Sequence, residues 1–308
     1  MTGLLQTQKI FFAMGTVNTV TVFEPAKKAL SAAGTFVSEL NRRLSAFAAD
    51  SEISAVSRNA GLAPVRVSAD NFRLIERAVG YAEITDGCFD ITSRPLSQLW
   101  KHAVRSGVLP DDNALRHARS LVNCQDIILD STRQTVMLKQ KGQQLDLGGI
   151  AKGFAADEIR NILLSYGVRD AVINLGGTVL NMGVPRTVGL QTPFAPNGQF
   201  FASLELKDGT AAVSSGVYEQ CRAVSGRRIH HIADPRSGCP SDSGLLAVTL
   251  IGQKAEELDA LATAALILGA EKSTELLKQR GIEAVFITDD RKVFVTDHLK
   301  KRLRMKGA

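Results

Sequence analysis

Apolar side chains recur at helical spacing in four stretches of the chain. In residues 25–44 they fall three or four positions apart, which places them on one face of a helix. The same spacing recurs in 68–86, in 154–166 and in the strongly apolar segment 256–268. These patterns predict four helices, and the polar segment 45–58 that follows the first of them predicts a loop or a short helix.

A second pattern, in which apolar and β-branched residues alternate with polar ones, is typical of strands. It occupies 9–23, where Met14-Gly15 interrupts it and indicates a hairpin or a bulged strand, and it occurs twice in 126–139 around a turn. Further short strands are predicted at 144–147, 170–177, 187–191, 200–206, 210–214, 228–233, 245–251, 283–288 and 292–296. Because strands often follow one another without an intervening helix, we expect an α+β fold. No repeat and no low-complexity linker divides the chain, so we expect a single domain over 1–308.

Composition and charge restrict the class of protein. With 308 residues, 44% of them hydrophobic and 22% charged, the chain can bury a sizeable core, which excludes a disordered or fibrous protein. The net charge is +6, but five Lys and Arg residues fall in the tail at about 299–308, so the rest of the chain is nearly neutral. A nucleic-acid-binding protein is expected to carry a basic face across its fold. We therefore expect a solvated basic tail and no nucleic-acid partner.

The sequence shows no clear signal for a membrane span, for secretion or for a cysteine-based motif. No apolar run approaches the roughly 18–20 residues of a membrane-spanning helix, so we expect no membrane span. The first residues lack the basic and apolar regions of a secretory signal, which favours a cytoplasmic protein, or a periplasmic one if a signal has been removed. Cys88, Cys124, Cys221 and Cys239 form no Cys-x-x-Cys motif, so we expect four unpaired thiols.

A glycine-rich turn precedes the helix predicted at 154–166. Neither the P-loop pattern nor the Rossmann pattern of glycines is present in the chain. The turn Gly148-Gly149-Ile150-Ala151-Lys152-Gly153 nevertheless brings backbone amides, the positive end of a helix dipole and one ammonium to the same place. This combination favours a phosphate site. The alternative is an ordinary tight turn with a solvent-facing Lys152.

The apolar helix predicted at 256–268 contains two oxygen-bearing side chains, Asp259 and Thr263. At i and i+4 they lie on one face of the helix. Hard oxygen ligands suit Mg²⁺ or Ca²⁺ better than Zn²⁺, and magnesium commonly completes its shell with substrate phosphates. The pair therefore predicts a magnesium site opposite the glycine-rich turn. Alternatively, Asp259 faces water and Thr263 bonds the carbonyl one turn earlier.

A strand that carries His230 and His231 leads into an Asp234-Pro235 turn. Histidine titrates near neutral pH and can take a proton from a hydroxyl nucleophile. Adjacent strand residues face opposite ways, so only one of the two imidazoles can point into a given pocket. A structural histidine, bonded within the fold, is the alternative.

The segment 87–96, followed by Trp100, combines aromatic residues with an apparently buried carboxylate, Asp90. Phe89 and Trp100 are of a type that stacks on a heterocycle, and the carboxylate could bond to one. A capped helix start explains the same residues, so both interpretations stay open.

Taken in order, these segments resemble the ApbE family, the FAD:protein FMN transferases. The residues that carry the resemblance are Met14-Gly15-Thr16, Leu44-Ser45 with 50–54, Phe89-Asp90-Ile91-Thr92 with Pro95-Leu96 and Trp100, 146–153, Asn174-Leu175-Gly176-Gly177, Ser214-Ser215-Gly216 with Tyr218-Glu219, His231-Ile232-Ala233-Asp234-Pro235 with Gly238, and 259–264. Each motif alone is weak, but their common order is specific.

The resemblance implies a single α+β catalytic unit with mixed or antiparallel sheets and packed helices. Such a unit binds FAD and Mg²⁺, moves the FMN half of FAD onto a Thr or Ser hydroxyl of a target flavoprotein, and releases AMP. Two other functions remain open: an FAD pyrophosphatase that uses water and gives FMN and AMP, and a non-catalytic protein that binds or delivers flavin.

The resemblance also implies site residues. The FAD site would be lined by Met14, Phe47, Cys88, Phe89, Asp90, Asp146, Lys152 and Ala233. Asp259 and Thr263 would bind magnesium with a backbone oxygen of Gly149, and His231 would be the catalytic base. The sequence departs from the family pattern at three positions. Phe47 stands where many members have Tyr, Ala233 where Ile or Leu is usual, and Ala262 where some members have a second metal-binding Asp.

Overall fold

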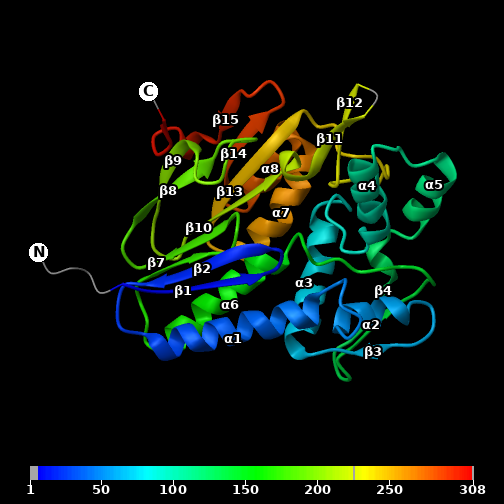
Figure 1. Cartoon of the computed structure of the whole chain (residues 1–308), viewed down its shortest axis with the longest axis horizontal. Coiled ribbons are helices and arrows are strands. Elements are labelled where there is room, and N and C mark those ends of the chain that lie inside the picture. The colour runs from blue at the N-terminus through cyan, green and yellow to red at the C-terminus, as the bar shows by residue number, and fades with distance from the viewer. Residues whose placement is uncertain (1–5, 225, 307–308) are drawn as a thin grey trace, which may run out of the picture.

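The computed structural model describes residues 6–224 and 226–306 and is centred on an eight-stranded antiparallel sheet (Figure 1). The strands lie in the order β1 (Thr7–Ala13), β2 (Thr16–Val22), β6 (Ala171–Asn174), β7 (Thr178–Met182), β10 (Ala211–Gly216), β13 (Leu245–Gly252), β14 (Glu283–Thr288) and β15 (Val293–Val295). β1 and β2 form the predicted hairpin, and its two-residue turn is Met14-Gly15, both with positive φ.

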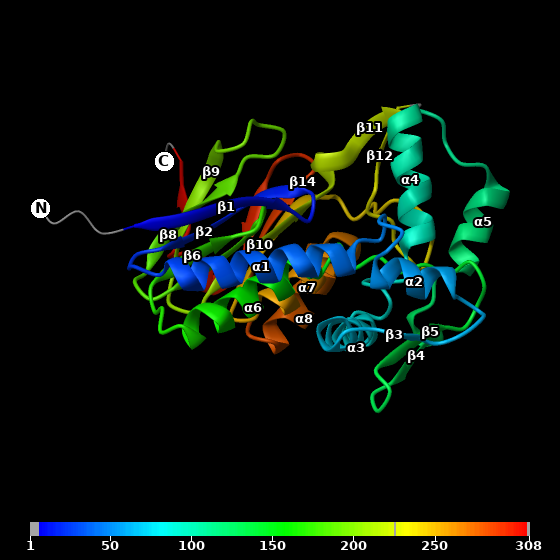
Figure 2. The same ribbon diagram turned by 60° about the horizontal axis from the view of Figure 1, so that its bottom comes forward.

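Helices cover one face of this sheet, as Figure 2 shows. They are α1 (Lys27–Leu44), α6 (Ala151–Ser165), α7 (Ala255–Leu268) and α8 (Ala270–Gln279). Their apolar faces and the inward residues of the strands form the main core, in which Phe154 and Leu266 are completely buried. Burial of this apolar surface, at roughly 25 cal/mol per Å², is the main force that holds the layers together.

A small second sheet covers part of the opposite face. It consists of β8 (Arg186–Gln191), β9 (Phe200–Leu206) and β16 (Arg304–Met305). Because strand side chains alternate between faces, Ile251 and Val285 point away from the helices and pack against Leu204 and Leu299. The C-terminal tail therefore contributes Leu299, in the 3₁₀ turn Asp297–Leu299, and strand β16, while its lysines stay exposed as predicted.

The remaining elements pack beside the main sheet (Figure 2). They comprise α2 (Glu52–Arg58), α3 (Ala69–Ile84), α4 (Arg94–Ser106), α5 (Asp112–Ser120), the small sheet β3 (Val65–Arg66), β5 (Thr135–Leu138) and β4 (Ile127–Asp130), the hairpin β11 (Cys221–Val224) and β12 (Arg227–His230), and the 3₁₀ turns Cys124–Asp126 and Val217–Gln220. Trp100 of α4 and Ile229 of β12 belong to a separate small core.

The structure confirms the α+β fold class and the four predicted helices, and 45–58 contains the short helix α2. It corrects the strand predicted at 144–147. That segment forms no strand beyond a single bridge from Gln144 to Ser93, and its alternation reflects burial of Leu145 and Leu147. Helices α5 and α8 and strands β3, β7, β11 and β16 were not predicted, and α4 was considered only as a possible helix start within 87–96. In the described residues, no helix is long and apolar enough to cross a membrane, and the four cysteines are unpaired.

Candidate active site

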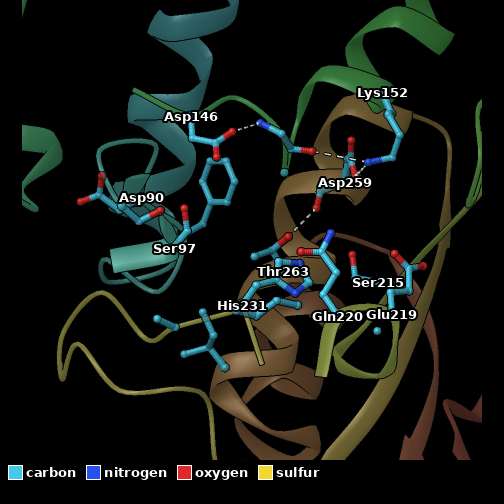
Figure 3. A pocket seen from close by; sticks show the side chains of 18 of the residues that line it. Asp90, Ser97, Asp146, Lys152, Ser215, Glu219, Gln220, His231, Asp259 and Thr263 are labelled. Atoms are coloured by element: carbon cyan, nitrogen blue, oxygen red, sulfur yellow. Dashed lines mark hydrogen bonds and ion pairs between the residues drawn. The ribbon is translucent and has the colours of Figure 1, made fainter. Parts of the chain in front are cut away.

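A cavity of about 370 Å³ lies where the main sheet, α6, α7 and α4 converge (Figure 3). Its size falls within the range of small-molecule sites. All twelve residues predicted for the site contribute to its wall: Met14, Phe47, Cys88, Phe89, Asp90, Asp146, Gly149, Lys152, His231, Ala233, Asp259 and Thr263. The structure thus brings the predicted residues to one place, although their individual roles stay predictions.

The N-terminus of α6 faces this cavity, held by a contact with α7. The backbone N–H of Gly153 donates to Oδ2 of Asp259 at 2.9 Å, and Nζ of Lys152 lies 3.8 Å from Oδ1 of the same carboxylate. The helices can approach this closely because Gly153 has no side chain. A Cβ at this position would lie only 2.7 Å from Cα of Glu256. The predicted combination of an ammonium and a positive helix end is therefore present in the cavity wall.

Three oxygen donors lie next to this helix end. Asp259 is 2% exposed, and Thr263 follows it by one turn of α7. A Cβ on Gly149 would lie 3.3 Å from Oγ1 of Thr263, so the Gly149 backbone is adjacent to that hydroxyl. The hydroxyl is 3.5 Å from the Asp259 carbonyl oxygen, which is a long hydrogen bond and leaves it able to bind another group.

This donor set fits a hard cation such as Mg²⁺, because all of its members are oxygen atoms and one is a buried carboxylate. Residues 6–224 and 226–306 contain no group of three or more His, Cys, Asp or Glu side chains placed to hold a metal ion. A cation at Asp259 would therefore take much of its coordination shell from a phosphate or from water, as magnesium commonly does.

His231 is the imidazole that faces the cavity. Its Nδ1 atom is buried and has no hydrogen-bond partner among the described residues. Burial lowers the pKa of His231 to about 4, and the nearby Lys101 ammonium contributes to this shift. The ring is therefore neutral at pH 7 and can accept a proton. His230 instead lies 3.0 Å from the Ser241 carbonyl through Nε2, which confirms that only one of the two points into the pocket.

Asp90 lines the cavity wall, and its carboxylate accepts hydrogen bonds from neighbouring loops, so its role toward a heterocycle stays a prediction. Oδ1 accepts from the N–H and the hydroxyl of Thr92, both at 2.7 Å, and Oδ2 accepts from the N–H of Cys124 at 2.9 Å. In Figure 3 this carboxylate lies on the side away from His231 and Asp259. Asp90 thus shapes the cavity wall and joins two loops. Burial raises the pKa of the neighbouring Cys88 thiol to about 11, so it is not a thiolate nucleophile.

Two aromatic residues line the cavity and a third does not. Phe89 is 4% exposed and forms part of the wall, whereas Phe47 is 76% exposed at its edge. Trp100 is buried in the small core beside β12, and its Nε1–H donates to the Gly238 carbonyl at 2.8 Å. The interpretation of Trp100 as a stacking partner for a heterocycle is therefore wrong. A helix does begin at Arg94, as the alternative for 87–96 expects, but Ser93 forms no side-chain cap hydrogen bond.

The sequence did not identify several polar residues that the cavity contains. Ser93, Ser97 and Lys101 lie at intervals of four at the start and along one face of α4, with Ser93 as the residue just before the helix. Ser215 belongs to β10, and Glu219 and Gln220 to the 3₁₀ turn Val217–Gln220 that follows it. The spacing of Ser93, Ser97 and Lys101 was the available signal, but it carries meaning only once α4 is recognised as a helix. Ser215 and Glu219 belong to the motifs of the resemblance, without an assigned role.

Comparisons with known proteins agree with this arrangement. The ApbE family model matches residues 14–286. A FAD:protein FMN transferase from Klebsiella pneumoniae is 38% identical over 257 residues, which is 83% of this chain and 80% of that protein. A FAD:protein FMN transferase from Treponema pallidum is 32% identical over 299 residues, with 91% of this chain and 82% of that protein covered.

Solved structures show the same fold. The crystal structure of the ApbE protein from Thermotoga maritima superposes with a TM-score of 0.86 at 26% identity and covers 97% of this chain and 99% of that one. The flavin transferase ApbE from Vibrio cholerae, at 23% identity, superposes with a TM-score of 0.83 over 97% of this chain and 99% of that one.

Proposed function

The chain belongs to the ApbE family, and from this premise we infer that it is a FAD:protein FMN transferase. Such an enzyme moves the FMN half of FAD onto a hydroxyl of a target flavoprotein and releases AMP. The observation that carries this inference is the cavity, in which a helix N-terminus with its ammonium, a set of oxygen donors and a neutral imidazole line the same space (Figure 3).

The pyrophosphate of FAD is proposed to lie at the N-terminus of α6. Lys152 lies within 3.4 Å of the Gly148 carbonyl and 3.8 Å of Asp259, so its ammonium is held beside the glycine-rich turn. A fixed positive charge and a helix end bind an anion without reorganisation during the reaction. These groups hold the phosphorus in place for attack from one side.

We further propose that the reaction depends on Mg²⁺, held by Asp259, Thr263 and the Gly149 backbone oxygen. Bound there, magnesium would neutralise charge on the phosphate oxygens. Lys152, whose ammonium lies 3.8 Å from Asp259, adds a positive charge beside these donors, and Lys101 of α4 adds a second one in the cavity wall.

The transfer step forms one P–O bond and breaks another. The hydroxyl oxygen of a Thr or Ser on the target attacks the FMN phosphorus, its proton passes to neutral His231, and the bond to the AMP phosphate breaks with its electron pair on AMP. A phosphate monoester leaves readily without protonation, so one base suffices. Nδ1 of His231, which has no partner within the described chain, is the free acceptor that this step requires.

Incubation of the chain with FAD, Mg²⁺ and a target flavoprotein tests the proposal. We expect protein-bound flavin fluorescence and AMP release, both abolished by EDTA and by replacing the acceptor Thr with Val. AMP release at the same rate without any target would instead identify an FAD pyrophosphatase. Binding of FAD with no AMP release would identify a flavin-binding or flavin-delivery protein.

A further inference from the structure

A buried guanidinium lies beneath the exposed ring at the cavity's edge. Arg94, the first residue of α4, is 7% exposed, and the carbon at the centre of its guanidinium is 4.6 Å from the centroid of the Phe47 ring. Its Nε donates to Oε1 of Gln144 at 2.9 Å. Its Nη1 is buried and has no hydrogen-bond partner within residues 6–224 and 226–306.

Burial of the Arg94 guanidinium without a carboxylate partner lowers the free energy of unfolding. A buried cation loses its hydration, and the cost is normally offset by a carboxylate partner. Arg94 forms no ion pair in the described part of the chain, and burial lowers its pKa against the opposing influence of Asp146. Its two partners, Phe47 and Gln144, connect it to the cavity. Phe47 forms part of the cavity wall, and Gln144 lies two residues before Asp146, which also lines the cavity.

Phe47, in contrast to the buried Arg94, is an apolar side chain exposed to solvent. It is 76% exposed, and its backbone N–H donates to Oγ of Ser45 at 3.2 Å, while its ring contacts Arg94. An exposed aromatic side chain that must stack on a ligand loses rotamer freedom on binding. A guanidinium anchored by Gln144 and in contact with the ring restricts that freedom in advance, and the high exposure of Phe47 leaves ring surface available to a ligand.

We propose that Arg94 is a positioning residue that holds the Phe47 ring at the edge of the cavity so that its exposed surface stacks on the isoalloxazine ring of FAD. The proposal rests on the proposed function, because it needs FAD in this cavity. It assigns a role to a side chain that does not itself line the cavity. The planar guanidinium is required as well as the charge, because it contacts the ring and Gln144 at once.

A double-mutant cycle on FAD binding tests whether Arg94 acts through Phe47. FAD affinity is measured by flavin fluorescence titration without a target protein, so that no transfer occurs. We expect Arg94→Met to raise the Kd for FAD about 5- to 30-fold, the range between an exposed and a desolvated cation–π contact. Because Arg94 acts through the ring, Arg94→Met added to Phe47→Ala should change the Kd no further. Additive effects, or a wild-type Kd in Arg94→Met, would overturn the proposal.

A matched control exists at the far side of the molecule. The Arg186 guanidinium lies 3.7 Å from the Phe23 ring, and neither residue lines the cavity. Arg186→Met removes a cation–π contact, together with the ion pair to Asp170, and should leave the Kd for FAD unchanged. In turnover, Arg94→Met should raise KM for FAD while kcat at saturating FAD is retained, and Arg94→Lys should restore only part of the affinity.

A second variant and a binding measurement that does not depend on catalysis keep the proposal testable. If Arg94→Met does not fold, Gln144→Leu leaves the guanidinium in place but removes its anchor, and the Kd should still rise; an unchanged Kd would count against the proposal. The binding cycle is also independent of catalysis. A chain that binds FAD and shows non-additivity, but transfers no FMN, would support the role of Arg94 and refute the proposed function.

Discussion

Replacing Gly153 with Ala should both destabilise the protein and impair the site. An added Cβ would lie 2.6 Å from the Ala255 carbonyl carbon and 2.7 Å from Cα of Glu256, where ordinary contacts begin at 3.4 Å. Helices α6 and α7 must therefore move apart by about 0.8 Å or more. The 2.9 Å hydrogen bond from the Gly153 N–H to Asp259 would then lengthen beyond hydrogen-bonding distance.

The magnitudes follow from these contacts. Overpacking costs about 1–3 kcal/mol and a lost bond to a carboxylate about 1.5–3 kcal/mol, while the better helix propensity of Ala returns about 1 kcal/mol. We expect a net loss of about 1.5–5 kcal/mol, measured by urea unfolding through the fluorescence of the single, buried Trp100. Displacement of Asp259 by this amount should lower FMN transfer by about 100-fold.

Gly80→Ala is the matched control. Gly80 lies within α3, and a Cβ there would meet no heavy atom within 4 Å. The same substitution should therefore raise stability by about 0.5–1 kcal/mol and leave transfer unchanged. If Gly153→Ala were as stable and as active as the unmodified chain, the close helix contact would not be what holds the site.

The other predictions concern the charged groups of the cavity. Asp259→Asn should abolish the response of transfer to added Mg²⁺ while the protein stays folded, and an unchanged magnesium titration would show that Asp259 is not a ligand. Lys152→Ala should weaken FAD binding by about 1–3 kcal/mol in a fluorescence titration, whereas equal affinity would exclude the turn as the pyrophosphate site. Because the pKa of His231 is lowered to about 4, kcat/KM should stay level as pH falls from 7 to 5 and decline only near pH 4, where the free base becomes protonated. Lys101→Met should move this decline to higher pH, since it removes a positive charge that lowers the pKa; a decline that stays near pH 6.5 in both proteins would contradict the assignment of the base.

The sequence predicted those parts of the fold in which one face of an element is consistently apolar. Helix α1 and the hairpin of β1 and β2 were found in this way, because burial on a single side produces a clear period. Helix α4 was considered only as a possible helix start because its inward face carries Arg94 and Trp100 among many polar residues. The segment 144–147 was misread as a strand because a buried extended segment alternates as a paired strand does.

Site residues could be predicted from the sequence where a polar or charged side chain stands within an otherwise apolar element. Asp259 was recognisable because a carboxylate in an apolar helix needs a partner, and the structure supplies the Gly153 N–H and Lys152. The hydrogen-bond partners of Asp90, Thr92 and the Cys124 N–H, could not be predicted, because they are set by the packing of two loops that no periodicity reveals. The role of Arg94 depends on a contact 47 residues away in sequence, with Phe47, and it is visible only in three dimensions.

The stoichiometry of the reaction tests the central claim most directly. The chain is incubated with FAD and Mg²⁺ and with a target flavoprotein that carries one acceptor Thr, and both the attached flavin and the released AMP are quantified, the former by intact mass and peptide mapping. The account predicts one FMN bound through phosphate to that Thr for each AMP released, and neither product from the Thr→Val target. Release of AMP without FMN attached to the target, at a rate that the target does not influence, would contradict it.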